Sequence, residues 1–347
     1  MYRIEPNTVP HLQSPSFAAG CAIQSFLSHW MANRDFLYFS FDPHLGAPVA
    51  SALGVPMGDY EETVFEDGEH RMRVQQPVSG RHCVVLDSLY AEATLSADRK
   101  LLRMAFFIGA LKAAGARRVS AVAPYLCYSR KDRRAQVGDP IITRHLAQIL
   151  EAVGCDQILT VDVHNLASFE NAFRIPADNI EGQALFVDHL VSRLANQQAV
   201  VVSPDAGGIK RSETFRRVLE QALGRPVERA MMEKLRGPDG VRGDLLVGPI
   251  EGRVAVLVDD LINTGSTLAR AARACRQHGA SAVYALATHG LFVDPASDTL
   301  ASADISELVV TTTVPAFRLR GAAAAKLVQL DCSALLAAAI EYHCQGR

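Results

Sequence analysis

Two adjacent carboxylates, Asp259 and Asp260, are the side chains with the clearest chemical potential in this sequence. They follow an apolar, mostly β-branched run at 254–258, which is typical of a strand buried on both faces of a sheet. Small and hydroxyl-bearing residues come next and lead into a helical pattern. These residues are Asn263, Thr264, Gly265, Ser266 and Thr267. The order predicts a strand, an acidic tip, a tight turn and a helix N-terminus.

Such a turn suits a sugar phosphate. The first N–H groups of a helix lack partners within it and carry partial positive charge, so they attract a phosphate. Gly265 lets the main chain approach that anion closely. Because two carboxylates would repel a phosphate, we expect Asp259 and Asp260 to hold sugar hydroxyls, or Mg²⁺ bound to those hydroxyls. A plain turn before a capped helix is the ordinary alternative.

A second charged segment contains Arg130, Lys131 and Asp132 and follows a predicted strand at 119–124. Open α/β sheets bind ligands beyond the carboxyl ends of their strands. Cations at that position suit a polyphosphate, although a solvated basic loop has the same composition.

Two further strand ends carry chemically useful side chains. His164 closes the apolar run 158–163, and the alternation of a strand would place it on the same face as Asp162. Asp205 follows the run 199–202 and precedes two glycines that free the main chain. Taken alone, each has a structural explanation, as a satisfied histidine or as a capping aspartate.

Two glycine-containing turns carry charged residues that are ordinary on their own. An Asp67-Gly68 turn between alternating segments predicts a hairpin, with Phe65 and Glu69 beside it. Lys234 and Arg236 stand before Gly-Pro-Asp-Gly, which predicts a mobile loop. A solvated hairpin tip and two surface cations are the simplest interpretations.

The composition of the 347 residues narrows the classes of protein. Alternating strand and helix patterns, with 49% hydrophobic residues, predict an α/β fold with sizeable cores. A net charge of -2 gives no basic field for nucleic acid. The scattered cysteines, without a C-x-x-C pair, indicate free thiols in a cytoplasmic protein. We expect no transmembrane segment and no signal peptide.

Five motifs, in this order, are similar to those of the ribose-phosphate pyrophosphokinases, or PRPP synthetases (PRPP is phosphoribosyl pyrophosphate). They are FEDGE at 65–69, YSRKD at 128–132, DVH at 162–164, SPDAGG at 203–208 and DDLINTGST at 259–267. The resemblance runs from about residue 36 to the end of the chain. It implies two tandem phosphoribosyltransferase-like domains, each a mostly parallel sheet flanked by helices.

The resemblance also implies a role for each motif. Phe65, Asp67 and Glu69 would bind ATP, in part across a subunit boundary, and so would Arg130, Lys131 and Asp132. The acidic tip and turn at 259–267 would hold ribose 5-phosphate. His164 and Asp205 would arrange Mg²⁺, and Lys234, Arg236 and His164 would be catalytic. The family's Mg²⁺-dependent reaction transfers the diphosphate of ATP to ribose 5-phosphate.

The domain organisation implied by the resemblance has four parts. Residues 1–35 form an extension without assigned chemistry, 36–182 carry the ATP motifs, 183–331 carry the ribose 5-phosphate loop, and helix 332–347 joins the first domain. Active sites shared between subunits imply a homo-oligomer, from dimer to hexamer, that needs neither nucleic acid nor membrane.

Three departures from the family's common pattern affect function. Gln136 and Gly138 replace arginines of a regulatory site, so we expect weaker regulation by ADP or phosphate. Lys131 replaces a glutamine and, together with the N-terminal extension, leaves room for another 5-phosphoribosyl acceptor, such as ADP-ribose, which ranks second. Asn263 replaces an aspartate, a change that position 263 should tolerate if main-chain N–H groups bind the phosphate.

A transferase that consumes PRPP ranks third, because it would need only one such domain and neither SPDAGG nor FEDGE. The non-enzyme alternative is a catalytically silent partner subunit, against which the intact Lys234, Arg236 and His164 argue.

Overall fold

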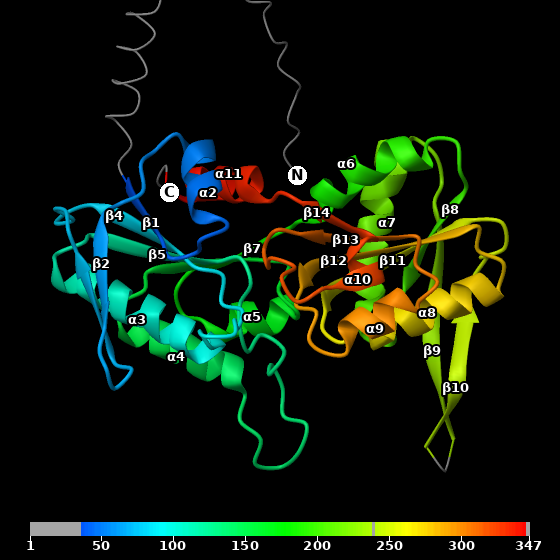
Figure 1. Cartoon of the computed structure of the whole chain (residues 1–347), viewed down its shortest axis with the longest axis horizontal. Helices are drawn as coiled ribbons and strands as arrows, with labels where there is room; N and C mark the ends of the chain where they lie inside the picture. The colour runs from blue at the N-terminus through cyan, green and yellow to red at the C-terminus, as the bar shows by residue number, and fades with distance from the viewer. Residues whose placement is uncertain (1–35, 238–239, 345–347) are drawn as a thin grey trace, which may run out of the picture. The chain divides into compact units, whose positions relative to one another are not determined.

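The computed structural model describes the main chain of residues 36–237 and 240–344, and the side chains of 36–233 and 245–344. The extension 1–35, with its possible helix, lies outside these residues. The described chain contains two parallel-stranded sheets flanked by helices and one separate hairpin (Figure 1). The predicted α/β class is confirmed. No helix in the described ranges is long and apolar enough to cross a membrane.

The first sheet has five parallel strands in the order β1-β4-β5-β6-β7. Its inner strands β4, β5 and β6 are almost entirely buried, which explains their continuous apolar runs. The five strands are β1 (Phe36–Ser40), β4 (His82–Leu86), β5 (Arg118–Ala123), β6 (Gln157–Val161) and β7 (Ala177–Ile180).

Two layers of helices bury the faces of the first sheet. One face packs against α3 (Ala97–Ala113), α4 (Ile142–Ala152) and α5 (Leu166–Ala172). The other packs against α2 (Gly46–Leu53) and α11 (Ser333–Cys344), so the last described helix covers the first sheet (Figure 1).

The second sheet has seven described strands in the order β10-β9-β8-β11-β12-β13-β14, and within this sheet only β10 runs antiparallel to its neighbour. The strands are β8 (Ala199–Ser203), β9 (Glu228–Gly237), β10 (Gly240–Val247), β11 (Val254–Ile262), β12 (Ala282–Gly290), β13 (Glu307–Thr311) and β14 (Leu327–Leu330).

Helices also cover both faces of the second sheet. One face packs against α6 (Gln183–Leu194) and α7 (Ile209–Leu223). The other packs against α8 (Ser266–Gln277), α9 (Ala296–Ala301) and α10 (Gly321–Ala324). A short 3-10 turn, Ala206–Gly208, links β8 to α7. The α8 and α7 helices therefore begin beyond neighbouring strands of one parallel sheet.

Two hairpins differ in how well the sequence predicted them. The hairpin of β2 (Tyr60–Val64) and β3 (His70–Val74) is confirmed around the Asp67-Gly68 turn. After Arg236, β9 continues to Gly237 and pairs with β10 from Gly240 onward. The centre of the predicted mobile loop, 238–239, lies outside the described residues, so its mobility stays a prediction.

Candidate active site

The main chain leaves β6 through a turn centred on Asp162. The β6 strand ends at Val161, and Asp162 has a left-handed φ of 40°. Both carboxylate oxygens of Asp162 accept from the main-chain N–H of Gly182 at 3.2 Å, and one accepts from the Thr288 hydroxyl at 2.5 Å. Burial raises the pKa of Asp162. The predicted strand alternation between Asp162 and His164 is wrong because the strand has already ended.

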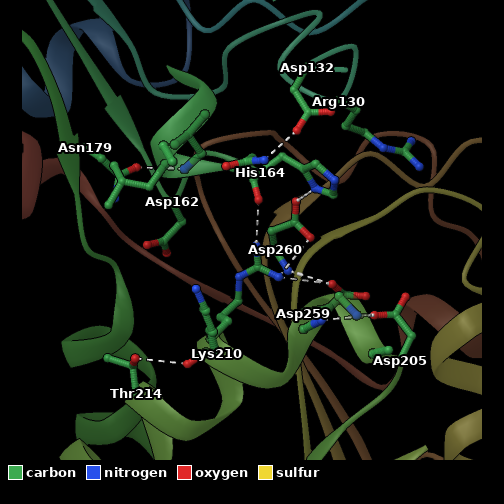
Figure 2. A pocket seen from close by; sticks show the side chains of 18 of the residues that line it. Arg130, Asp132, Asp162, His164, Asn179, Asp205, Lys210, Thr214, Asp259 and Asp260 are labelled. Carbon is green, nitrogen blue, oxygen red and sulfur yellow. Dashed lines mark hydrogen bonds and ion pairs between the residues drawn. The ribbon is translucent and has the colours of Figure 1, made fainter. Parts of the chain in front are cut away.

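The side chain of His164 reaches the acidic tip of the second sheet. Its Nδ1 lies 2.6 Å from Oδ2 of Asp260 (Figure 2). The Asp260 side chain is only 5% exposed, whereas that of His164 is 39% exposed. This contact joins the carboxyl end of β6 to that of β11, so the two sheets contribute to one site.

Asp259 and Asp260 lie within β11, which continues to Ile262 and therefore extends past the predicted strand. The guanidinium of Arg211, in the first turn of α7, lies 3.6 Å from Oδ1 of Asp259 and 3.3 Å from Oδ1 of Asp260. Burial and the neighbouring Asp260 raise the pKa of Asp259 to about 8. Burial opposes ionisation of Asp260, but the His164 hydrogen bond and the Arg211 charge bring its pKa below the usual range.

The turn between β11 and α8 has the features expected of an anion site. Gly265 has φ 75°, and no side chain caps the helix that it precedes. The hydroxyls of Thr264 and Ser266 lie 3.2 Å apart. The predicted residues 263–267 all line a hollow of about 210 Å³, together with Asp259 and Asp260. The turn therefore offers N–H groups and hydroxyls beside two carboxylates.

A larger cavity of about 1260 Å³ adjoins the same groups. Five predicted residues line both the cavity and the smaller hollow: Arg130, His164, Asp205, Asp259 and Asp260. Asp132 lines the larger cavity only and accepts a hydrogen bond from the Asn165 amide at 2.7 Å (Figure 2). The structure thus brings cations, acids and a histidine from separate parts of the chain around one space.

Asp205 caps the short turn before α7. Its Oδ1 accepts from the N–H groups of Gly207 and Gly208 at 2.9 and 3.1 Å. Within the described residues, no three His, Cys, Asp or Glu side chains are grouped to surround a metal ion directly. Magnesium usually keeps several waters and takes one or two carboxylates plus substrate phosphates. The carboxylates here fit that manner of binding.

Residues 36–154 match the family model for the N-terminal domain of ribose phosphate pyrophosphokinase, and 229–346 match that for the phosphoribosyl synthetase-associated domain. A ribose-phosphate pyrophosphokinase of Caldanaerobacter subterraneus is 34% identical over 79% of this chain and 84% of its own. One from Streptococcus pyogenes is 34% identical, over 87% and 91% respectively. This chain belongs to the ribose-phosphate pyrophosphokinase family.

A solved relative extends this result to the fold. The phosphoribosylpyrophosphate synthetase of Mycobacterium smegmatis superposes with a TM-score of 0.80, at 30% identity, over 90% of this chain and 99% of that one. The resemblance seen in the motifs and the predicted phosphoribosyltransferase-like fold are both confirmed.

Other residues predicted from the ribose-phosphate pyrophosphokinase motifs lie elsewhere. Phe65, Asp67 and Glu69 form the tip of the β2–β3 hairpin, where the Glu69 N–H donates to Asp67 at 3.0 Å; Phe65 is exposed. They line neither cavity, and nor does Lys131. Lys234 and Arg236 lie on β9, and their side chains fall outside the described residues.

Arg211 and Thr288 contribute to the site but were not predicted from the sequence. Arg211 lies in the first turn of α7, where a cation is unfavourable to the helix dipole, and this was the signal that could have found it. Thr288 lies on β12, and nothing local indicates that its hydroxyl donates to Asp162. Both contacts join distant parts of the chain.

Proposed function

We propose that this protein transfers the β,γ-diphosphate of ATP to the 1-hydroxyl of ribose 5-phosphate, with Mg²⁺, to give PRPP and AMP. The observation that carries the proposal is the meeting of His164 with the Asp259–Asp260 tip beside an uncapped helix N-terminus. Membership of the ribose-phosphate pyrophosphokinase family supports the same reaction.

In this reaction the 1-hydroxyl oxygen forms a bond to the β-phosphorus of ATP. The bond from that phosphorus to the oxygen bridging to the α-phosphate breaks, AMP leaves with that oxygen, and the hydroxyl proton passes to solvent. The protein aligns the reactants and stabilises developing charge. Asp259 and Asp260 accept from the ribose hydroxyls, and the turn 263–267 holds the 5-phosphate.

The ATP side of the site draws on the first sheet. Arg130, which lines the larger cavity, would neutralise phosphate charge, and Lys131 and Asp132 belong to the same segment. We assign His164 and Asp205 to the Mg²⁺ region. Magnesium, when bound, supplies charge neutralisation on the phosphates and fixes their geometry. Lys234 and Arg236 would then contact the diphosphate as it transfers.

We further propose that the FEDGE hairpin serves the site of a neighbouring copy. Phe65, Asp67 and Glu69 line no cavity with His164 in their own chain, yet an exposed aromatic ring beside two acids suits an adenosine. The proposal therefore includes a homo-oligomer in the cytoplasm. Each copy would have one domain in 36–182, extended by α11, and the other in 183–331.

The direct test is an AMP-release assay with Mg²⁺-ATP and either ribose 5-phosphate, ADP-ribose or no acceptor. We expect AMP only with ribose 5-phosphate, and a product with the mass of PRPP. If AMP forms only with ADP-ribose, ADP-ribose and not ribose 5-phosphate is the acceptor. The absence of AMP with every acceptor would identify a silent partner subunit and overturn the proposal.

Arg236 provides a test of catalysis. Arg236→Ala should lower kcat by roughly 10²-fold or more and leave the KM for ATP nearly unchanged. A contact made in the transition state stabilises the chemical step, and its loss has little effect on ground-state binding of ATP. Steady-state kinetics measure both constants. The matched control is Arg229→Ala, on the same strand but outside the two cavities at the site. A normal kcat for Arg236→Ala would remove Arg236 from the mechanism.

A further inference from the structure

Arg211 has a position that its own helix does not explain. It lies in the first turn of α7, where the unpaired N–H groups carry partial positive charge and a cation is disfavoured. Its side chain is 26% exposed, so solvent only partly screens that charge. A compensating interaction must therefore come from outside the helix.

The compensating interaction is with the acidic pair. Nη1 of Arg211 lies 3.6 Å from Asp259 and 3.3 Å from Asp260, whose side chains are 19% and 5% exposed. Two neighbouring carboxylates in such a confined place repel each other strongly. One guanidinium that faces both oxygens offsets this repulsion and fixes the direction in which the remaining oxygens point.

The same guanidinium also reaches the first sheet. Nη2 of Arg211 donates to the main-chain carbonyl of His164 at 3.4 Å, while the His164 ring contacts Asp260 at 2.6 Å. Arg211, His164 and Asp260 therefore form a closed set of contacts between α7, the β6 exit and β11. Displacement of any one of them would move the other two.

We propose that Arg211 is a positioning residue for the sugar substrate. It holds Asp259 and Asp260 in the orientation that receives two ribose hydroxyls, and it keeps the His164 segment against them. This inference rests on the proposed function, because it takes ribose 5-phosphate as the sugar. Lysine can supply the charge, but a single ammonium cannot reproduce the planar fork that spans three acceptors.

The experiment compares Arg211→Gln, Arg211→Lys and Arg217→Gln. Arg217 is on the same helix, 73% exposed, and pairs with Glu213, so it controls for loss of one positive charge from α7. For Arg211→Gln we expect kcat/KM for ribose 5-phosphate to fall roughly 10²-fold and the KM for ATP to stay within about threefold. Arg211→Lys should recover about tenfold, and Arg217→Gln should match the wild type.

Calorimetric titration with ribose 5-phosphate alone separates this inference from the proposed reaction. We expect Arg211→Gln to bind the sugar about tenfold more weakly than the wild type, whether or not AMP is released. Equal sugar affinities would overturn the positioning role even in an active enzyme. The inference would also be overturned if Arg211→Gln lost affinity for ATP and for the sugar equally, unfolded at a lower temperature and was not rescued by Arg211→Lys. Arg211 would then have a purely structural role.

Discussion

One carboxylate outside the candidate site, Asp87, has an environment that disfavours its charge. It is 0% exposed, and neither oxygen accepts a hydrogen bond from the described part of the chain. The Arg103 guanidinium lies 3.9 Å away. Burial, with the charges of Asp42 and Glu92, raises the pKa of Asp87 to about 7, although Lys100 and Arg103 oppose the shift.

This pKa shift gives a definite sign to the pH dependence of stability. Between about pH 4 and pH 7 the folded state holds a proton on Asp87 that the unfolded state has released, so this contribution to stability falls as pH rises and is flat above pH 7. Asp87→Asn removes that slope, which is at most ~1.4 kcal/mol per pH unit. The free energy of unfolding of Asp87→Asn, relative to that of the wild type, should therefore rise as the pH increases from about 4 to 7.

Urea unfolding of the wild type and Asp87→Asn from pH 4 to pH 8 measures this difference. Asp188→Asn, on the exposed side of α6, is the matched control and should run parallel to the wild type. A difference between Asp87→Asn and wild type that does not change with pH would contradict a raised pKa.

At the level of single residues, the sequence indicated the site acids Asp259 and Asp260, but not Arg211, which contacts both. Asp259 and Asp260 stand out because adjacent carboxylates before a Gly-containing turn are locally unusual. Arg211 is separated from them by some 50 positions, and its contacts depend on the packing of α7 beside β11. Local patterns carry no information on such contacts, and so Arg211 and Thr288 were missed.

The β11–α8 turn requires glycine at position 265, because it has no room for a side chain there. Gly265 has φ 75°, and an added Cβ would lie 2.8 Å from the Leu300 side chain of α9. Gly265→Ala should strain the turn by roughly 1–2 kcal/mol and shift the main chain of residues that line the hollow. We expect the KM for ribose 5-phosphate to rise tenfold or more, measured by steady-state kinetics.

Gly224→Ala is the control for backbone strain alone. Gly224 also has a positive φ, 64°, at the end of α7, but nothing lies within 4 Å of an added Cβ. This variant should lose stability and keep a normal KM. If Gly265→Ala also keeps a normal KM, the turn does not bind the phosphate.

Among the elements, strand positions were predicted well where the apolar run was continuous, as in β5 and β8. The end of β6 was predicted too late, because Asp162 adopts a left-handed conformation and the strand stops at Val161. The pairing of β9 with β10 was not predicted, because it depends on contacts between the two strands and not on a local apolar pattern.

At the scale of the whole chain, the last described helix, α11, packs on the first sheet. Leu336, at 0% exposure, packs in one apolar cluster with Leu53 of α2 and Leu86 of β4. Leu336→Ala should cost ~2–5 kcal/mol of stability through a cavity in that cluster. Leu335→Ala, on a less buried side of the same helix, should cost clearly less.

Hydrogen exchange locates the effect of Leu336→Ala within the molecule. We expect faster exchange in β1 and β4 and little change in β8 and β11, because α11 covers the first sheet. Loss of protection confined to the second sheet would contradict this assignment.

The place of α11 also has a consequence for biosynthesis. A ribosome makes β1 and α2 about 290 residues before it completes α11, which corresponds to roughly 15–60 s at 5–20 residues per second. During that interval the apolar surface around α2 has no covering helix. Nascent chains of this protein should therefore need protection by a chaperone until α11 has emerged, even though most of the first sheet emerged much earlier.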